Sequence, residues 1–465
     1  MAPAPDAAEA ALAASAGEAL EADGAPEAPA APSLEATPSS AGAAPAASHA
    51  EGAPEVPPTV LVVHASVGSG HRSAANAVGQ ALEMLREQGV APEGLRVEVL
   101  DILDFGRIVF DGDKTASMFT GATRPLYDLT WRYTLTGRLL WGGGTIWARI
   151  MYPKFVEYVQ QKKPLAIVAT HITAANVAVS ARMLSRQRFP IVCVPTDYEV
   201  EGLWPHLYTD LFCVANEHMA ETLRPRRVPE ERIQVTGIPA RPTFLTDADP
   251  EAVRERFGLP QDKHLVLALA GAHLPRPYVH FRQSIDELLP YLPTLKGIHL
   301  VVVAGTDQEY ARRLRARCAD LELDNVTVLE YVEEMAALMA ASDAVICKSG
   351  GLVVTECLCA KVPMILLGRA YGQEKANVSM LTAAGAALHV TTARELAYAL
   401  RHINKNPEST RSMLVNASFL RKPEAALDIA RATLALAGPD ALPNPRAAKR
   451  HFVHFYLGGK PAHTR

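Results

Sequence analysis

Short apolar segments alternate with longer amphipathic segments from residue 59 onward. The apolar segments are nearly continuous runs of Val, Ile and Leu, which is typical of parallel strands covered on both faces by helices. Segments between them, such as 73–88 and 174–187, have the apolar spacing of helices. The predicted strands of the first half lie at 59–64, 95–100, 165–170, 190–195 and 210–215.

The same alternation resumes after a Pro- and Asp-rich stretch at 239–250, which we interpret as a linker. We therefore predict an α/β chain with two Rossmann-like, doubly wound domains, at 59–245 and 246–438. Such domains bind ligands at the carboxyl ends of their strands, here in the cleft between the two sheets. The predicted strands of the second half lie at 264–270, 299–304, 327–330, 344–347 and 363–367.

The two ends of the chain differ from this body in composition. Residues 1–58 hold nine acidic residues and no Lys or Arg, and they are rich in Ala and Pro. A segment with so few branched or aromatic residues cannot bury enough surface to order itself, so we expect a disordered acidic tail. It also lacks the pattern of a secretory signal or transit peptide. Residues 439–465 form a basic tail.

Charge and cysteine content exclude several classes of protein. The formal net charge is −4, and the body without its acidic tail is only weakly positive, which argues against a nucleic-acid partner. The sequence contains no run of 18 apolar residues, so no membrane-spanning helix is predicted. The six cysteines lack the paired spacing of a disulfide scaffold.

A glycine loop follows the first predicted strand and leads into a helix. It contains Gly68 and Gly70, which allow a tight turn and a close approach to a ligand, and then His71. The helix N-terminus favours a negative charge and disfavours an imidazolium, so His71 should stay neutral and able to accept a proton. On these residues alone, His71 is as well explained as a structural helix cap.

A second glycine turn lies between the strand ending near 348 and the next helix. Its geometry aims backbone N–H groups at a phosphate. A carboxylate in the second helical turn can accept hydrogen bonds from two neighbouring hydroxyls, and the following strand brings further polar residues to the same sheet edge. The residues concerned are Ser349, Gly350, Gly351 and Glu356, followed by Gln373, Glu374 and Asn377.

Together these motifs resemble the monogalactosyldiacylglycerol synthase and processive diacylglycerol glucosyltransferase family, relatives of the transferase that builds the peptidoglycan lipid intermediate. The resemblance covers roughly 59–435. It implies the GT-B fold and an inverting, UDP-sugar-dependent hexosyltransferase that moves galactose or glucose to diacylglycerol, without a cofactor, at the cytoplasmic face of the membrane. The alternatives are another lipid or polyprenyl acceptor, or an inactive relative that only binds nucleotide-sugar or lipid. The matching stretches are 68–75, 194–197, 235–242, 348–356, 372–377 and 422–425.

The resemblance also implies roles for individual residues. His71 is the expected base, and Asp197 is the second choice or the group that orients the histidine. Glu356 would hold the ribose. The uracil edge would meet the backbone near Val332, and Gly68 and Gly70 would lie on the acceptor side. The Ser349–Gly351 turn would face the diphosphate, and Gln373, Glu374 and Asn377 would complete the donor site.

One loop departs from the family pattern. The second domain of the family opens with a glycine-rich loop, whereas residues 270–276 here read Ala-Gly-Ala-His-Leu-Pro-Arg and retain only Gly271. Diphosphate contact at Gly271 is therefore in question, and the change favours either a different donor or the inactive alternative.

The segment 119–158 contains nine aromatic residues and five Lys or Arg against two acidic residues. Trp131, Trp141 and Trp147 are among them, and Trp and Tyr prefer the membrane–water interface, while cations favour anionic lipid. We predict a lipid-facing insertion. The alternative is a helical insertion whose aromatic residues pack on the sheet.

Other patterns have plainer interpretations. The Asp-x-Asp sequences at 111–113 and 247–249 are interpreted as solvated turns, so no metal site is predicted. The cysteines at 347, 357 and 359 fit core packing. His171, at the end of a predicted strand, is equally well explained by substrate contact and by a structural role.

Overall fold

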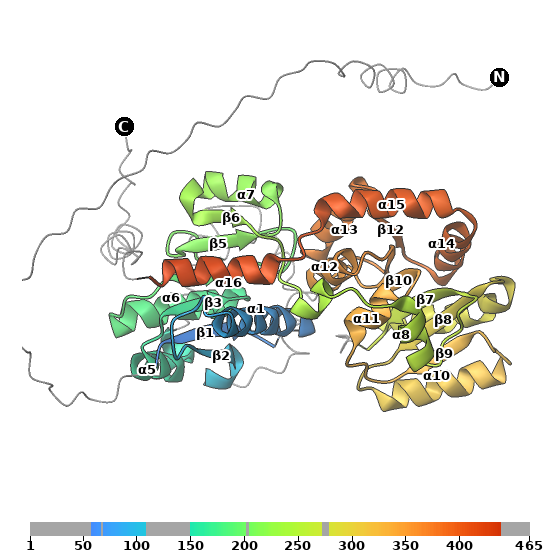
Figure 1. Cartoon of the computed structure of the whole chain (residues 1–465), viewed down its shortest axis with the longest axis horizontal. Coiled ribbons are helices and arrows are strands. Elements are labelled where there is room, and N and C mark those ends of the chain that lie inside the picture. Colours follow the sequence, from blue (N-terminus) through green and yellow to red (C-terminus); the bar gives the residue numbers. More distant parts are fainter. Residues whose placement is uncertain (1–56, 67, 108–148, 201–203, 272–278, 439–465) are drawn as a thin grey trace, which may run out of the picture. The chain divides into compact units, whose positions relative to one another are not determined.

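The computed structural model describes residues 57–66, 68–107, 149–200, 204–271 and 279–438. Its first half contains a six-stranded sheet with the order β2-β1-β3-β4-β5-β6, in which every pair of neighbours is parallel (Figure 1). The strands are β1 (Thr59–His64), β2 (Arg96–Asp101), β3 (Ala166–Ala169), β4 (Ile191–Cys193), β5 (Leu211–Val214) and β6 (Ile233–Val235).

The helices of this half follow the strands in sequence. β1 is buried along its whole length, as a Val- and Leu-rich strand covered on both faces should be. α1 turns a face of small residues toward the sheet, so a Cβ on Gly79 would lie only 2.9 Å from a methyl group of Val99. The helices are α1 (Ser69–Glu87), α5 (Pro153–Lys162), α6 (Ile172–Ser185) and α7 (Glu217–Leu223).

The second half repeats this plan. Its parallel sheet has the order β12-β11-β10-β7-β8-β9. The strands are β7 (His264–Leu269), β8 (Ile298–Val303), β9 (Val326–Leu329), β10 (Ala344–Cys347), β11 (Met364–Leu367) and β12 (Ala387–Val390). The helices are α8 (Pro250–Arg256), α9 (Val279–Leu288), α10 (Gln308–Asp320), α11 (Met335–Ala340), α12 (Gly351–Cys359), α13 (Glu374–Ala383), α14 (Ala393–Lys405) and α15 (Pro407–Leu420).

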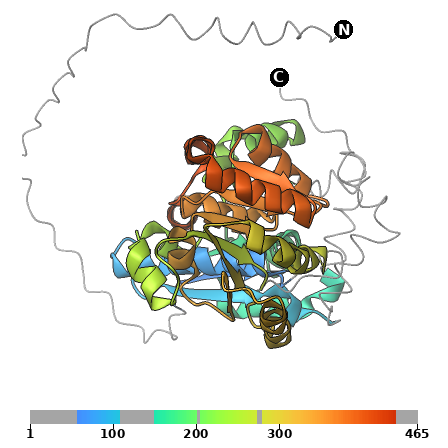
Figure 2. The ribbon, with the colours of Figure 1, turned by 90° about the vertical axis from the view of Figure 1, so that its right-hand side faces the viewer.

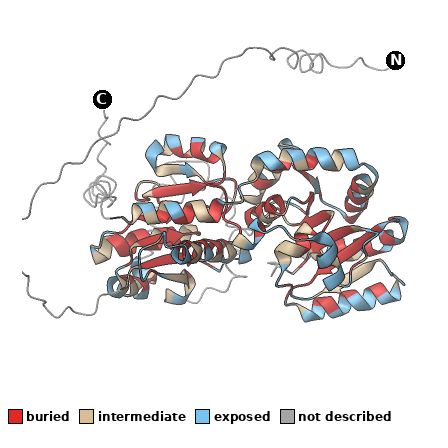
Figure 3. Cartoon of the chain, in the orientation of Figure 1, coloured by how far each residue is buried: buried red, intermediate tan, exposed pale blue. Residues whose placement is uncertain are grey.

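Two parallel sheets with helices form the GT-B arrangement that the sequence predicts. Figure 3 shows the strands of both sheets mostly buried and the outer helices exposed on one side. The switch in strand order falls beside β1 in the first sheet and beside β7 in the second, where doubly wound folds place their ligands. The cysteines at 347, 357 and 359 are buried in the core, as predicted.

The last described helix, α16 (Ala425–Leu436), packs on the first sheet. Its buried residues Ala426, Ile429 and Ala430 share a core cluster with Val60 of β1, and Figure 1 shows α16 lying along the first half. Figure 2 gives the view from the right-hand side of Figure 1. The sequence analysis assigned this segment to the second domain. The difference arises because an amphipathic helix does not specify which of two apolar sheets it covers.

Only part of the predicted lipid-facing insertion can be compared with the structure. Tyr152 and Phe155 are buried in the core of the first half, and Tyr158 donates a hydrogen bond to Glu98, so these three aromatic residues follow the packing alternative. Trp131, Trp141 and Trp147 lie outside the described residues, as does the acidic segment 1–56. No helix in the described ranges is both long and apolar enough to span a bilayer.

Candidate active site

Loops at the carboxyl ends of strands from both sheets meet at one place. Gly68, with a φ of 107°, turns the chain from β1 into α1, and Gly350 precedes the first residue of α12. The two helix N-termini are close, since a Cβ on Gly70 would lie 3.7 Å from the Cβ of Leu352. The predicted base and the predicted diphosphate turn therefore face one junction.

His71 is held through one ring nitrogen. Its Nδ1 lies 3.0 Å from the carbonyl oxygen of Thr170 and 2.9 Å from Oγ1 of Thr196. A carbonyl can only accept, so Nδ1 carries the hydrogen and the neutral ring keeps the lone pair on Nε2. The Thr170 hydroxyl also donates to the carbonyl oxygen of His71, at 2.9 Å, so both side chain and backbone are fixed.

The surroundings of His71 favour the neutral imidazole. Burial lowers the pKa of His71 below its ordinary value, and the nearby Asp197 carboxylate opposes this shift only in part. The sequence analysis attributed neutrality to the helix dipole, whereas desolvation is the main cause in the fold. A neutral ring with a free Nε2 lone pair is suited to accept a proton.

His171 lies directly against the predicted base. The two imidazole rings meet edge to face, with centroids 4.6 Å apart. The Nδ1 of His171 accepts a hydrogen bond from the backbone N–H of Thr173, which caps the N-terminus of α6. Burial lowers the pKa of His171 well below its ordinary value. His171 thus has a structural role at the site, and it adds no positive charge beside His71.

Asp197 has a different partner from the one considered in the sequence analysis. Its carboxylate accepts a hydrogen bond of 2.8 Å from the side-chain amide of Asn377. The groups that orient His71 are instead Thr170 and Thr196. The sequence analysis assigned a role to neither, although Thr196 lies in the matching stretch 194–197 beside Asp197.

The donor side contains an ion pair that the sequence analysis missed. Nζ of Lys348, at the end of β10, lies 3.1 Å from the Glu374 carboxylate, and both side chains are mostly buried. Burial raises the pKa of Glu374, while Lys348 opposes the increase. The second oxygen of Glu374 has no hydrogen-bond partner among the described residues. A lysine directly before a glycine turn was the available signal.

Glu356 lies on α12, in the second turn after Gly351. Burial raises the pKa of its carboxyl group from the ordinary 4.5 to about 7, against the opposing charge of Arg241. Arg241 lies in the linker between the two sheets, and its Nε is buried without a hydrogen-bond partner in the described part of the chain. A carboxylate and a guanidinium in this state are suited to bind polar groups of a ligand.

Two predicted diphosphate glycines are required by close backbone contacts. A Cβ on Gly351 would lie 2.0 Å from the carbonyl oxygen of Thr196, across the junction between the two halves. A Cβ on Gly271 would lie 2.6 Å from the Cα of Gly305, so packing alone accounts for the retained glycine of the altered loop. Residues 272–276 of that loop lie outside the described ranges.

The remaining predicted donor residues lie at the same sheet edge. Gln373 is the N-terminal cap position of α13, and Val332 is buried in the loop between β9 and α11. Asn377 is fully buried and bonds to Ser349 and to the first half of the chain. Contacts of these residues with a donor stay predictions.

Comparison with known proteins agrees with this arrangement. Residues 71–240 match the family described as Monogalactosyldiacylglycerol (MGDG) synthase, and residues 280–429 match the Glycosyltransferase family 28 C-terminal domain. A processive diacylglycerol beta-glucosyltransferase of Bacillus pumilus is 28% identical over 57% of this chain and 67% of the relative. One of Bacillus cereus is 25% identical over 81% of this chain and 94% of the relative. This chain spans about half the length of other relatives with that name.

The solved structure of an S. aureus MnaA–UDP complex shares the fold, with a TM-score of 0.53 at 13% identity over 88% of this chain and 100% of that chain. The first family matches the first half of the chain and includes His71. The second family matches the second half and includes the 348–377 region. The chain is therefore similar, in both of its halves, to the monogalactosyldiacylglycerol synthase and processive diacylglycerol glucosyltransferase family of GT-B glycosyltransferases.

Proposed function

We propose that this protein is an inverting glycosyltransferase that moves a hexose from a UDP-sugar to the hydroxyl of diacylglycerol. The observation that carries the proposal is the junction itself. A neutral His71 with its lone pair on Nε2 lies beside the loop that touches Gly351, the first residue of α12. A proton acceptor and a helix N-terminus of the kind that binds phosphate therefore lie at one junction, the arrangement that a single displacement requires.

In the proposed reaction the acceptor oxygen attacks C1 of the hexose as His71 Nε2 takes the hydroxyl proton. The bond between C1 and the β-phosphate oxygen breaks, and UDP leaves with the electron pair. The N–H groups at the start of α12 and the Lys348 ammonium stabilise the negative charge that develops on the diphosphate. Attack opposite the leaving group inverts the configuration at C1. Glu374 and Gln373 would contact the sugar, and Glu356 the ribose.

The donor and acceptor follow from the relatives. The relatives matched here are described as processive diacylglycerol beta-glucosyltransferases. The family matched by residues 71–240 is described as monogalactosyldiacylglycerol synthase. Glucose and galactose are both candidate donors, and diacylglycerol is the candidate acceptor.

A donor-by-acceptor matrix tests the proposal. Radiolabelled UDP-glucose, UDP-galactose and UDP-N-acetylglucosamine are each offered with vesicles that contain diacylglycerol, a glycosyl diacylglycerol or a polyprenyl phosphate. We expect label in glycosyl diacylglycerol and a loss of about 100-fold or more in His71→Ala, because a general base contributes that much. Circular dichroism and calorimetric UDP binding establish that the variant is folded.

The altered 270–276 loop favours one competing function, a relative that binds UDP-sugar without turnover. UDP binding with no transfer to any acceptor in the matrix would establish that alternative and refute the proposed enzyme. Label in the polyprenyl product alone would retain the chemistry but replace the acceptor.

We further propose that the protein works at a membrane surface and needs no metal ion. Sedimentation with vesicles that contain about a third anionic lipid, compared with neutral vesicles at two salt concentrations, tests the first point because electrostatic attachment weakens with salt. Transfer measured with and without EDTA tests the second. Full activity in EDTA is the expected result, and a loss restored by Mg²⁺ would refute the expectation.

A further inference from the structure

The loop that follows β4 joins the two halves of the chain. We call its residues Thr196, Asp197 and Tyr198 the 196–198 loop. This loop belongs to the first half and contacts α12 and α13 of the second half. Asn377 in α13 makes hydrogen bonds with two residues of this loop. Its side chain is fully buried at the junction.

Asn377 uses its whole side-chain amide on protein groups. Its Nδ2 donates to Asp197 Oδ1 and to the carbonyl oxygen of Ser349, each at 2.8 Å. Its Oδ1 accepts from the backbone N–H of Tyr198 at 2.9 Å. A primary amide has only two N–H donors, so no polar hydrogen is left for a donor sugar. The resemblance implies that Asn377 belongs to the donor site, whereas its side-chain amide is occupied here by protein groups.

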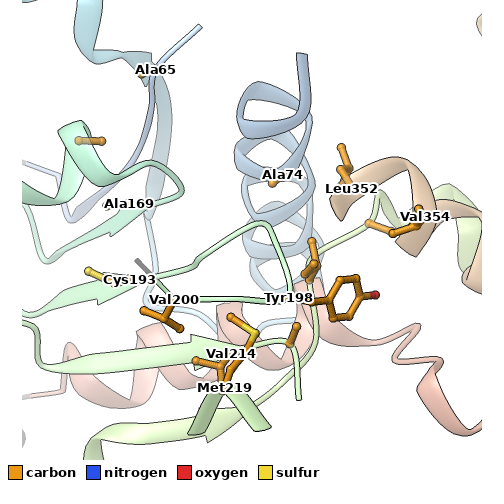
Figure 4. Close-up of a cluster of buried hydrophobic side chains, with 14 of the residues drawn as sticks. Ala65, Ala74, Ala169, Cys193, Tyr198, Val200, Val214, Met219, Leu352 and Val354 are labelled. Carbon is orange, nitrogen blue, oxygen red and sulfur yellow. The ribbon is translucent and has the colours of Figure 1, made fainter. Parts of the chain in front are cut away.

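Two further contacts fix the same loop. The Tyr198 hydroxyl lies 3.2 Å from Oγ1 of Thr355, and Figure 4 shows the Tyr198 ring extending toward α12 near Leu352 and Val354. The Thr196 carbonyl oxygen lies against Gly351, where a Cβ would come within 2.0 Å. The loop is thus bonded at consecutive residues to one surface of the second half.

The 196–198 loop also reaches the predicted base. The Oγ1 of Thr196 lies 2.9 Å from Nδ1 of His71. Asp197 and Tyr198 are hydrogen-bonded to Asn377, and Thr196 directly precedes them in the chain. A movement of the Asn377 side chain therefore shifts Thr196, which contacts the His71 imidazole. A displacement of about 1 Å in a catalytic group can reduce a rate by roughly 100-fold.

We propose that Asn377 is a positioning residue that clamps the 196–198 loop to the second domain, so that Thr196 holds His71 with Nε2 toward the acceptor. The role of the clamp in catalysis rests on the proposed function, but the clamp itself does not. The side chain has to be a primary amide. An aspartate would place a second carboxylate against Asp197 and Ser349 and remove both donors.

The test compares Asn377→Ala with Thr196→Val and with the control Asn416→Ala. Asn416 is a surface residue in α15 that donates to the carbonyl oxygen of Gly385 and lies outside the clamp. Hydrogen–deuterium exchange of the peptide containing 196–200 reports on the clamp without any activity. Calorimetry with UDP and with UDP-glucose reports on donor binding, and kcat reports on positioning.

In Asn377→Ala we expect faster exchange at 196–200, a kcat reduced at least tenfold but less than in His71→Ala, and affinities for UDP and UDP-glucose within about twofold of wild type. Thr196→Val should lower kcat without faster exchange at 196–200, whereas Thr196→Ser, which keeps the hydroxyl, should have a kcat near that of wild type. In the double variant Asn377→Ala/Thr196→Val, the fold-loss in kcat should be smaller than the product of the two single losses. The control should match wild type in all three measurements.

Unchanged exchange at 196–200 in Asn377→Ala would overturn the clamp. A loss of UDP-glucose affinity with UDP affinity retained would identify Asn377 as a sugar ligand and also overturn it. Faster exchange with normal kcat would overturn the positioning role. If wild-type protein transfers no sugar to any acceptor, the proposed function and the catalytic role fail together, whereas the exchange data decide the clamp separately.

Discussion

Replacing Glu356 with Gln tests whether the fold holds this carboxyl group in an unfavourable state. Burial raises the pKa of Glu356 from its ordinary 4.5 to about 7. The native protein therefore binds this proton more tightly than the unfolded chain does. The carboxyl group costs no stability below pH 4.5, and its cost grows as the pH rises and is complete above pH 7. The gap between the two pKa values corresponds to about 3 kcal/mol.

Gln is neutral at every pH and has nearly the same shape, so Glu356→Gln escapes this cost. We expect the variant to exceed wild type in unfolding free energy by about 3 kcal/mol at pH 8 and by about 1 kcal/mol or less at pH 5. Urea unfolding at both pH values measures the difference. Glu87→Gln, at the exposed end of α1, is the matched control and should show the same difference from wild type at pH 5 and pH 8.

The same variant should bind UDP more weakly. A hydrogen bond to a charged group contributes about 1.5–3 kcal/mol, so losing the carboxylate should raise the Kd for UDP by about 10- to 100-fold at pH 8. Higher stability with lower affinity is the expected trade at a binding site. The reasoning is refuted if Glu356→Gln is no more stable than wild type at pH 8, or if its advantage is the same at pH 5.

Further predictions concern close packing and a buried charge. Gly351→Ala should lower the melting temperature by several degrees and reduce soluble yield, because the new Cβ would lie 2.0 Å from a backbone oxygen. The control is Gly350→Ala, whose Cβ would meet nothing closer than 3.8 Å, and its melting temperature should be near that of wild type. Gly271→Ala should destabilise in the same way, and a melting temperature equal to wild type would show that the two glycine loops separate easily. Arg182 is buried in an ion pair with Asp210, so Arg182→Met should cost about 3–5 kcal/mol in urea unfolding, and a loss below 1 kcal/mol would contradict that burial.

Local patterns were sufficient for most of the fold. Continuous apolar runs predicted the central strands, because strands covered on both faces leave no polar positions. The structure adds two strands that the sequence analysis did not identify, β6 and β12, which are the edges of their sheets. Both have only three or four residues and are partly exposed, so neither has a recognisable apolar run.

The sequence by itself determined the fold class, the two glycine turns and the polar residues beside them, since backbone turns and strand burial depend on residues adjacent in the chain. Only the tertiary structure decided what those residues touch. Asn377 meets Asp197 across 180 positions, Thr196 meets His71 across 125, and Lys348, directly after β10, meets Glu374 at the start of α13. Hydrogen-bond partners and desolvation are properties of the folded surroundings, and a one-dimensional pattern does not contain them.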